Sequence, residues 1–296
     1  MPILEIVKII TPILIIALVG FIFGRLRKID LKTIADLIIY VTAPALALTQ
    51  LSMQRMDIQE IMSISGAAIF VILGCGLIAY LIFKLTKASV PIGLYLPIMF
   101  MNTGFIGYPL ALFAFGGIGL NKAIIYDITN AVLIFTLGIY IASHGKDRWQ
   151  ALKIPFIYAA AAGLILSFTG IRLPHYLYSP LYIIGGTTIP LALLMLGCRL
   201  ANMKITSWKL PAIASIIRIG AGLGLGFLAV FIFRLSGVTA KVVILISSLS
   251  SAITCIALSE EYDTDKELIA STIALSTIIS FVAIIIILNW LAKLTI

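Results

Sequence analysis

Apolar stretches long enough to cross a bilayer follow one another along this 296-residue chain, with short polar connections between them. A membrane-spanning helix needs about 20 mostly apolar residues, and lipid offers backbone polar groups no partner outside a helix or a closed barrel. Hydrophobic residues make up 61% of the chain and charged residues 11%, against roughly 45–50% and 25% in soluble domains. The sequence therefore predicts an all-α polytopic membrane protein with ten transmembrane helices, near residues 4–23, 34–52, 61–83, 93–115, 122–142, 154–170, 178–199, 210–233, 240–259 and 268–291.

The basic residues predict how these helices are oriented. The formal net charge is +9, but Lys and Arg lie mostly in the connections, so we expect a topological role and no nucleic-acid partner. The connections after the odd-numbered segments hold thirteen of them, against seven on the opposite side. The thirteen are Arg25, Arg27, Lys28, Lys32, Lys84, Lys87, Lys146, Arg148, Lys153, Arg199, Lys204, Lys209 and Lys266. Because positive loops stay cytoplasmic, both termini are predicted to be extracytoplasmic in an inner (plasma) membrane protein.

Several classes of function lack the residues they need. The chain has no room for a soluble catalytic domain, and it contains no HExxH, GxSG or GxGD motif. The chain has three cysteines, each alone within an apolar segment and without a CxxC pair or a nearby His: Cys75, Cys198 and Cys255. We therefore expect a non-enzymatic protein without a metal or an organic cofactor.

The run NTGFIGYPL at residues 102–110 interrupts the fourth segment with polar, glycine and proline residues. Such groups are tolerated at membrane depth where they are buried in protein or line a wet cavity. A proline also frees the carbonyl four residues before it, which predicts further helix breaks at Pro44 and Pro190. Asn102, Thr103, Gly104 and Pro109 are the predicted substrate-binding residues of this run.

The two halves of the chain resemble each other. TAPALAL at 42–48 and TIPLALL at 188–194 are offset by 146 residues, and the same offset moves Asn102 onto Ser248, inside the cluster SSLSSAIT. With five spans in each half, 1–147 and 148–296, the second half must be inverted in the membrane. The ninth segment has no proline or glycine in its cluster, so it is either broken there or a continuous helix whose serines bond to the preceding turn.

Two ionisable residues within apolar segments have competing interpretations. Asp127, with Asn130 on the same helical face, is either a site for coupling to H⁺ or Na⁺ or an acidic residue at an interfacial helix start. Arg218 lies about eight residues inside the eighth segment. It is either a charge partner for an anionic substrate or for Asp127, or a side chain that reaches the interface or fills a structural pair.

Motifs in both halves resemble the auxin efflux carrier family. They are NTGFIGYPLALFAFGGIGL and YDITN in the first half, and IPLALLMLGCRLA and ALSEEYDTDKELIASTIALST in the second. The resemblance implies a ten-helix inverted repeat, related to bile-acid sodium symporters, in which segments four and nine cross within a mobile core. Segments one, two, six and seven would form the scaffold. Ser250 stands where the family usually has the second proline, and the ninth segment offers Ser250, Ser251 and Thr254 to a substrate.

We therefore expect a secondary carrier of a small organic anion, either auxin-like or a dicarboxylate, that works by elevator-type alternating access in the lipid bilayer. The alternative is a channel or ligand sensor on the same fold, because one cavity can bind without carrying. A homodimer formed through the scaffold helices is a further expectation.

Overall fold

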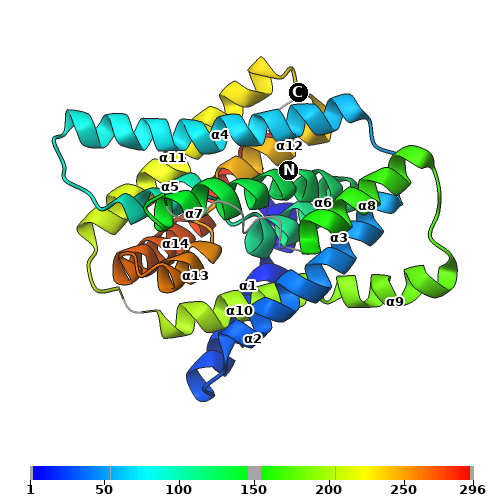
Figure 1. The fold of residues 1–296 in the computed structure, drawn as a ribbon, viewed down its shortest axis with the longest axis horizontal. Coiled ribbons are helices and arrows are strands. Elements are labelled where there is room, and N and C mark those ends of the chain that lie inside the picture. The colour runs from blue at the N-terminus through cyan, green and yellow to red at the C-terminus, as the bar shows by residue number, and fades with distance from the viewer. Residues whose placement is uncertain (1–2, 54, 146–154, 204, 294–296) are drawn as a thin grey trace.

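The computed structural model describes residues 3–53, 55–145, 155–203 and 205–293, and within these ranges every regular element is a helix (Figure 1). Four basic residues used to predict the orientation lie outside the described residues, namely Lys146, Arg148, Lys153 and Lys204. The predicted boundary between residues 147 and 148 also lies there.

Seven helical stretches are long and apolar enough to cross a membrane, which supports a multi-pass membrane protein. They are Ile6–Leu26, Leu31–Ser52, Ile58–Leu85, Thr103–Ala142, His175–Asn202, Lys209–Ile232 and Lys266–Leu291. Two shorter apolar helices, Pro155–Thr169 and Gly237–Ser247, fall below this length.

The count of long helices differs from the predicted ten because the fourth and ninth predicted spans are interrupted and the helix of the sixth, Pro155–Thr169, is short. The end of the fourth also continues into the fifth, so that 40 residues from Thr103 to Ala142 form one helical run. A straight helix of that length would measure about 60 Å, twice the thickness of the hydrocarbon core. The run bends at Gly116, whose φ of 66° and ψ of −161° are non-helical. Ten spans remain a prediction, with Gly116 as the turn between two of them.

The helices pack in two groups (Figure 1), which we call the scaffold bundle and the core bundle. The scaffold bundle consists of α1 (Ile3–Leu26), α2 (Leu31–Leu37), α3 (Ala43–Ser52), α8 (Pro155–Thr169), α9 (His175–Gly186) and α10 (Thr188–Asn202). The core bundle consists of α4 (Ile58–Leu85), α5 (Tyr95–Met99), α6 (Tyr108–Leu133), α7 (Ile139–Ala142), α11 (Lys209–Ile232), α12 (Gly237–Ser247), α13 (Thr254–Glu261) and α14 (Lys266–Lys293).

Small residues allow the scaffold helices α1 and α10 to pack closely. A Cβ added to Gly197 of α10 would lie 1.9 Å from the carbonyl oxygen of Ala17, and one added to Gly20 of α1 would lie 2.2 Å from that of Leu194. Contacts of this kind let backbones approach in membranes, where dispersion forces replace the hydrophobic effect between helices. In Figure 1, α4 runs across the upper part of the view, while α3 and α8 lie side by side to the right of the centre.

Each of the three prolines predicted to break a helix follows an irregular turn within a longer helical stretch. Pro44 in α3 follows a π-helical turn, η1 (Ile38–Thr42), and Pro109 in α6 follows another, η3 (Thr103–Gly107). Pro190 in α10 follows the interruption at Thr187, where α9 has ended. A proline cannot donate the hydrogen bond that would continue the preceding helix, which explains the irregular turn before it.

Candidate functional site

Both the fourth and the ninth predicted spans are broken near their middle. In the fourth, α5 ends at Met99 and helical structure resumes at Thr103. In the ninth, α12 ends at Ser247 and α13 begins at Thr254. Of the two alternatives for the ninth segment, the structure has the break, although no proline is present.

The two breaks cross and bond to each other in an antiparallel manner. The main-chain amide of Asn102 donates to the main-chain carbonyl of Ser250, and the main-chain amide of Ala252 donates to the carbonyl of Phe100, both at 2.9 Å. These bonds flank an isolated bridge between Met101 and Ser251. Each broken segment thus supplies backbone partners that the other needs away from water.

Serine hydroxyls complete the ninth break without a proline. The Ser248 hydroxyl donates to the Leu245 carbonyl at 2.7 Å, and the Ser251 hydroxyl donates to the Pro97 carbonyl at 2.6 Å. The Ser251 amide donates to the Ser276 hydroxyl of α14 at 3.1 Å. Serine side chains therefore bond to main-chain groups around the break. Serine hydroxyls can compete in this way with the hydrogen bonds of a regular helix.

Arg218 of α11 binds the helix ends that precede both breaks. Its guanidinium donates to the carbonyls of Ile98 and Met99 at 3.1 and 3.0 Å, and also to the carbonyl of Ser247. The side chain is fully buried, and a Cβ on Gly222 would fall 2.1 Å from its Nη2 atom. Two helix C-termini carry about −0.5 charge each, so together they match the single positive charge of Arg218.

The contacts of Arg218 favour a structural role over the other interpretations. Ion pairs within the described part of the chain join Lys122 to Glu60 and Lys266 to Asp263, so Arg218 is not paired with Asp127. It is not an interfacial side chain either, because it is fully buried. Its partners are main-chain carbonyls, so Arg218 is a structural cation of the crossing.

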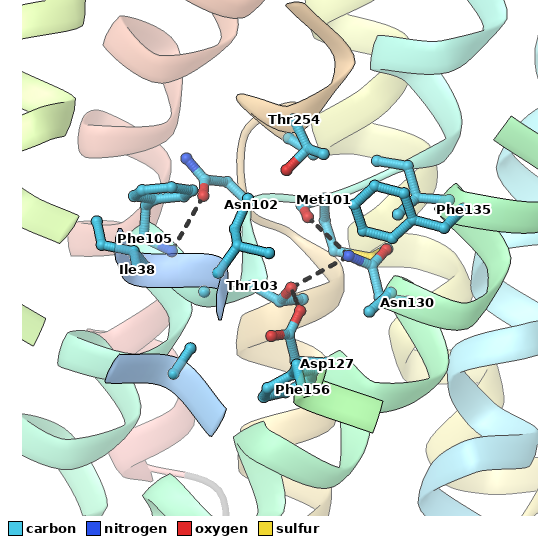
Figure 2. Close-up of a pocket in the computed structure, with 16 residues that line it drawn as sticks. Ile38, Met101, Asn102, Thr103, Phe105, Asp127, Asn130, Phe135, Phe156 and Thr254 are labelled. Atoms are coloured by element: carbon cyan, nitrogen blue, oxygen red, sulfur yellow. Dashed lines mark hydrogen bonds between the residues drawn. The ribbon is translucent and has the colours of Figure 1, made fainter. Parts of the chain in front are cut away.

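A cavity of about 90 Å³ lies at the crossing, between the two bundles. Figure 2 shows Asn102 and Thr103 of the fourth segment beside Asp127 and Asn130 of α6, with Thr254 of α13 across from them. The scaffold bundle contributes apolar walls from η1, α3 and α8, including Ile38, Ala43 and Phe156. The cavity thus combines a polar floor from the core with an apolar cover from the scaffold.

A hydrogen-bond network connects the polar lining (Figure 2). The Thr103 hydroxyl donates to one Asp127 carboxylate oxygen, and the Tyr108 hydroxyl donates to the other at 2.6 Å. Asn130 Nδ2 donates to Thr103 Oγ1 at 3.1 Å and to the Met101 carbonyl at 3.2 Å. The network therefore ties α6 to the fourth break.

Two buried amide atoms in the lining have no partner within the described residues: Nδ2 of Asn102 and Oδ1 of Asn130. Asn102 is 2% exposed and Asn130 4%. The Oδ1 atom of Asn102 is already used, because it accepts from the Phe105 amide at 3.2 Å. A buried amide group without a partner costs about 1–3 kcal/mol, so Asn102 presents a donor, and Asn130 an acceptor, for a bound molecule.

Six of the predicted site residues line this cavity, namely Asn102, Thr103, Gly104, Asp127, Asn130 and Thr254. The remaining ones do not: Pro109, Ser250, Ser251, Pro44, Pro190 and Arg218. The prolines shape the helices that hold the lining. The Ser250 carbonyl accepts from the main-chain amide of Asn102, and the Ser251 hydroxyl donates to the Pro97 carbonyl. Both residues therefore bond the ninth segment to the fourth.

Asp127 lies within the helical stretch that follows the bend, away from its first turn. It lies 11 residues beyond the bend at Gly116, about 16 Å along α6. Sequence reasoning missed its partner Tyr108, which lies 19 residues earlier, across the bend from Asp127. It also missed Ser247, whose hydroxyl bonds to the Tyr126 hydroxyl at 3.0 Å. Within the described residues, no group of three or more His, Cys, Asp or Glu side chains could hold a metal ion.

Comparison with known proteins places this site in a wider context. Residues 139–288 match the protein family described as "Membrane transport protein". An uncharacterized transporter of Methanocaldococcus jannaschii is 31% identical over 294 residues, which cover 92% of this chain and 94% of the relative. An uncharacterized transporter of Methanothermobacter thermautotrophicus is 30% identical over 290 residues, with the same two coverages.

Proposed function

Because this chain belongs to the membrane transport protein family, the auxin efflux carrier family that its sequence resembles, we propose that it is a secondary carrier of a small organic anion. The observation that carries this proposal is the cavity at the crossing. It is lined by a buried amide donor without a partner, and it lies between two bundles of helices.

The chemistry of the lining favours an anion. Asn102 presents Nδ2, and the helices that resume after each break begin at Thr103 and Thr254, beside the cavity. Helix N-termini carry partial positive charge, which suits a carboxylate. The volume of about 90 Å³ is well below the roughly 300–1,000 Å³ of sites for drug-sized ligands. We therefore propose a carboxylate of a few carbon atoms as the substrate.

The position of the cavity supports alternating access of the elevator type. The core bundle supplies its polar groups, while the scaffold bundle supplies apolar residues that cover them. If the core bundle slides along the scaffold bundle, the same polar groups pack against different scaffold residues. The cavity then becomes accessible from the other side of the membrane. Ten spans in two inverted halves, an inner-membrane location and extracytoplasmic termini belong to this proposal. Its support is the paired interruption of the fourth and ninth segments.

A thermal-shift screen of the purified chain tests the proposed substrate class. Acetate, lactate, malonate, succinate and indole-3-acetate are compared with lactamide and malonamide, which match two of them in size but carry no charge. A ligand at 100 times its Kd stabilises the native state by about 2.7 kcal/mol. We expect the small carboxylates to raise the midpoint and the amides to leave it unchanged. Equal shifts with the amides, or none with any carboxylate, would contradict an anion site.

A further inference from the structure

We propose that Asp127 takes up one proton for each monovalent anion that the cavity binds, so that the chain couples anion transport to protons. This inference rests on the anion site proposed above. It follows from the balance of charges around the crossing and from the hydrogen bonds of a single carboxylate.

Asp127 is the single ionisable side chain among the sixteen residues that line the cavity. The helix starts at Thr103 and Thr254 each bring about half a positive charge to the same space, so an ionised Asp127 leaves the empty cavity nearly neutral. An anion would then add a net negative charge beside the ionised carboxylate, among side chains that are largely buried, where like charges repel strongly. A proton on Asp127 removes that repulsion.

Other charged groups are not available to balance an anion in the cavity. Arg218 is bound to three carbonyls at the opposite ends of the broken helices, and Lys122 is paired with Glu60. Tyr108 is the titratable side chain in contact with Asp127 from the start of its own helix. Among the side chains that the structure describes, the remaining titratable groups on α6, on η1 and on helices packed against α6 do not line the cavity: Tyr126, Tyr40, Lys8, Arg25, Cys75, Tyr80, Lys84, Tyr158 and Lys241.

The hydrogen bonds around Asp127 describe how a proton would prepare the site. A hydroxyl has one hydrogen to donate and two lone pairs to accept with. Thr103 now accepts from Asn130 and donates to Asp127. When Asp127 Oδ1 carries a proton, it can donate to the second lone pair of Thr103. The hydroxyl hydrogen of Thr103 is then free to turn into the cavity and donate to the anion.

The same contacts favour a proton over a sodium ion. Both carboxylate oxygens of Asp127 already accept a hydroxyl hydrogen, from Thr103 and from Tyr108. A hard cation needs several oxygen ligands whose lone pairs point at it, and each Asp127 oxygen has already used one of its two lone pairs on a hydroxyl hydrogen. A proton requires only the Thr103 hydroxyl to rotate.

Calorimetric titration with lactate and malonate at pH 7 tests this inference directly on the full chain. Each titration is run in two buffers with different ionisation enthalpies, and the difference in heat gives the number of protons taken up per anion. For the wild type we expect about one proton per lactate, and a Kd that weakens up to tenfold per pH unit as Asp127 ionises in the free protein. Asp127→Asn should take up none, and its Kd should no longer change with pH.

Asp36→Asn is the matched control, because it removes an exposed carboxylate of α2 and should keep the wild-type proton count. Anion binding without proton uptake by the wild type, or binding that requires sodium instead, would overturn proton coupling and leave the proposed carrier standing. Absence of binding by both probes would count against the anion site itself. If Asp127→Asn does not fold, the wild-type proton count and the pH dependence of its Kd still decide the matter.

Discussion

Replacing Arg218 with glutamine is expected to destabilise the protein more than any other single change discussed for this chain. The substitution removes the charge that compensates two helix C-termini and leaves at least one of three buried carbonyls without a donor. Removing one partner from a buried charged group typically costs about 3–5 kcal/mol. The thermal midpoint and the monodisperse yield of purified Arg218→Gln measure this loss.

Two further variants separate charge from geometry at this position. Arg218→Lys keeps the positive charge but loses the planar fork that reaches α5 and α12 together, so we expect an intermediate midpoint. Lys209→Gln removes an exposed charge from the start of the same helix and should change the midpoint by less than about 0.5 kcal/mol in equivalent stability. A stability of Arg218→Gln equal to that of Lys209→Gln would contradict the role assigned to the guanidinium.

Asn102→Asp is expected to abolish anion binding while the fold is retained. The new side chain keeps an oxygen to accept from the Phe105 amide, the bond that Asn102 Oδ1 makes now. However, it replaces the free Nδ2 donor with a negative charge in a buried site. We expect the Kd for the best carboxylate of the screen to rise at least about 100-fold, equivalent to about 2.7 kcal/mol. Calorimetric titration measures the Kd, and the thermal midpoint without ligand measures the fold.

Asn102→Ser provides the comparison within the site, because serine also caps helix starts well but its hydroxyl is shorter. It loses the donor without adding charge, so we expect a Kd about tenfold higher, or about 1.4 kcal/mol. Asn289→Asp places the same change at an exposed position on α14 and should leave the Kd unchanged. Tight binding by Asn102→Asp would rule out Asn102 as the donor to the anion.

Composition and the length of the apolar stretches were sufficient to predict a helical membrane protein, because these properties depend on each segment separately. The position of the first break could also be predicted, since Asn102, Gly104 and Pro109 cannot all continue an ordinary membrane helix. The number of long helices was less predictable. Gly116 turns the chain within one helical run, and neighbouring glycines give no signal of which one adopts a positive φ.

The contacts that make the site depend on residues far apart in the chain, and a single sequence does not reveal them. Arg218 reaches carbonyls about 120 residues before it and 29 residues after it, and carbonyls carry no side-chain signature. The ninth break relies on a hydroxyl from α14 in place of a proline. The sequence therefore left that break open, and it did not reveal that the Ser250 carbonyl and the Ser251 hydroxyl bond to the fourth segment.

Counterflow in proteoliposomes tests the central claim most directly, that this chain is an alternating-access carrier of a small anion. Vesicles are loaded with the unlabelled carboxylate that gives the largest thermal shift, and are then diluted into a trace of the labelled form. A carrier that releases an unlabelled anion outside binds a labelled one there and carries it inward. We therefore predict a transient, saturable accumulation of label above equilibrium, and we expect none with Asn102→Asp. Equilibration without overshoot, together with ohmic current far above carrier turnover, would identify a channel and contradict the carrier. Binding without any flux would identify a sensor.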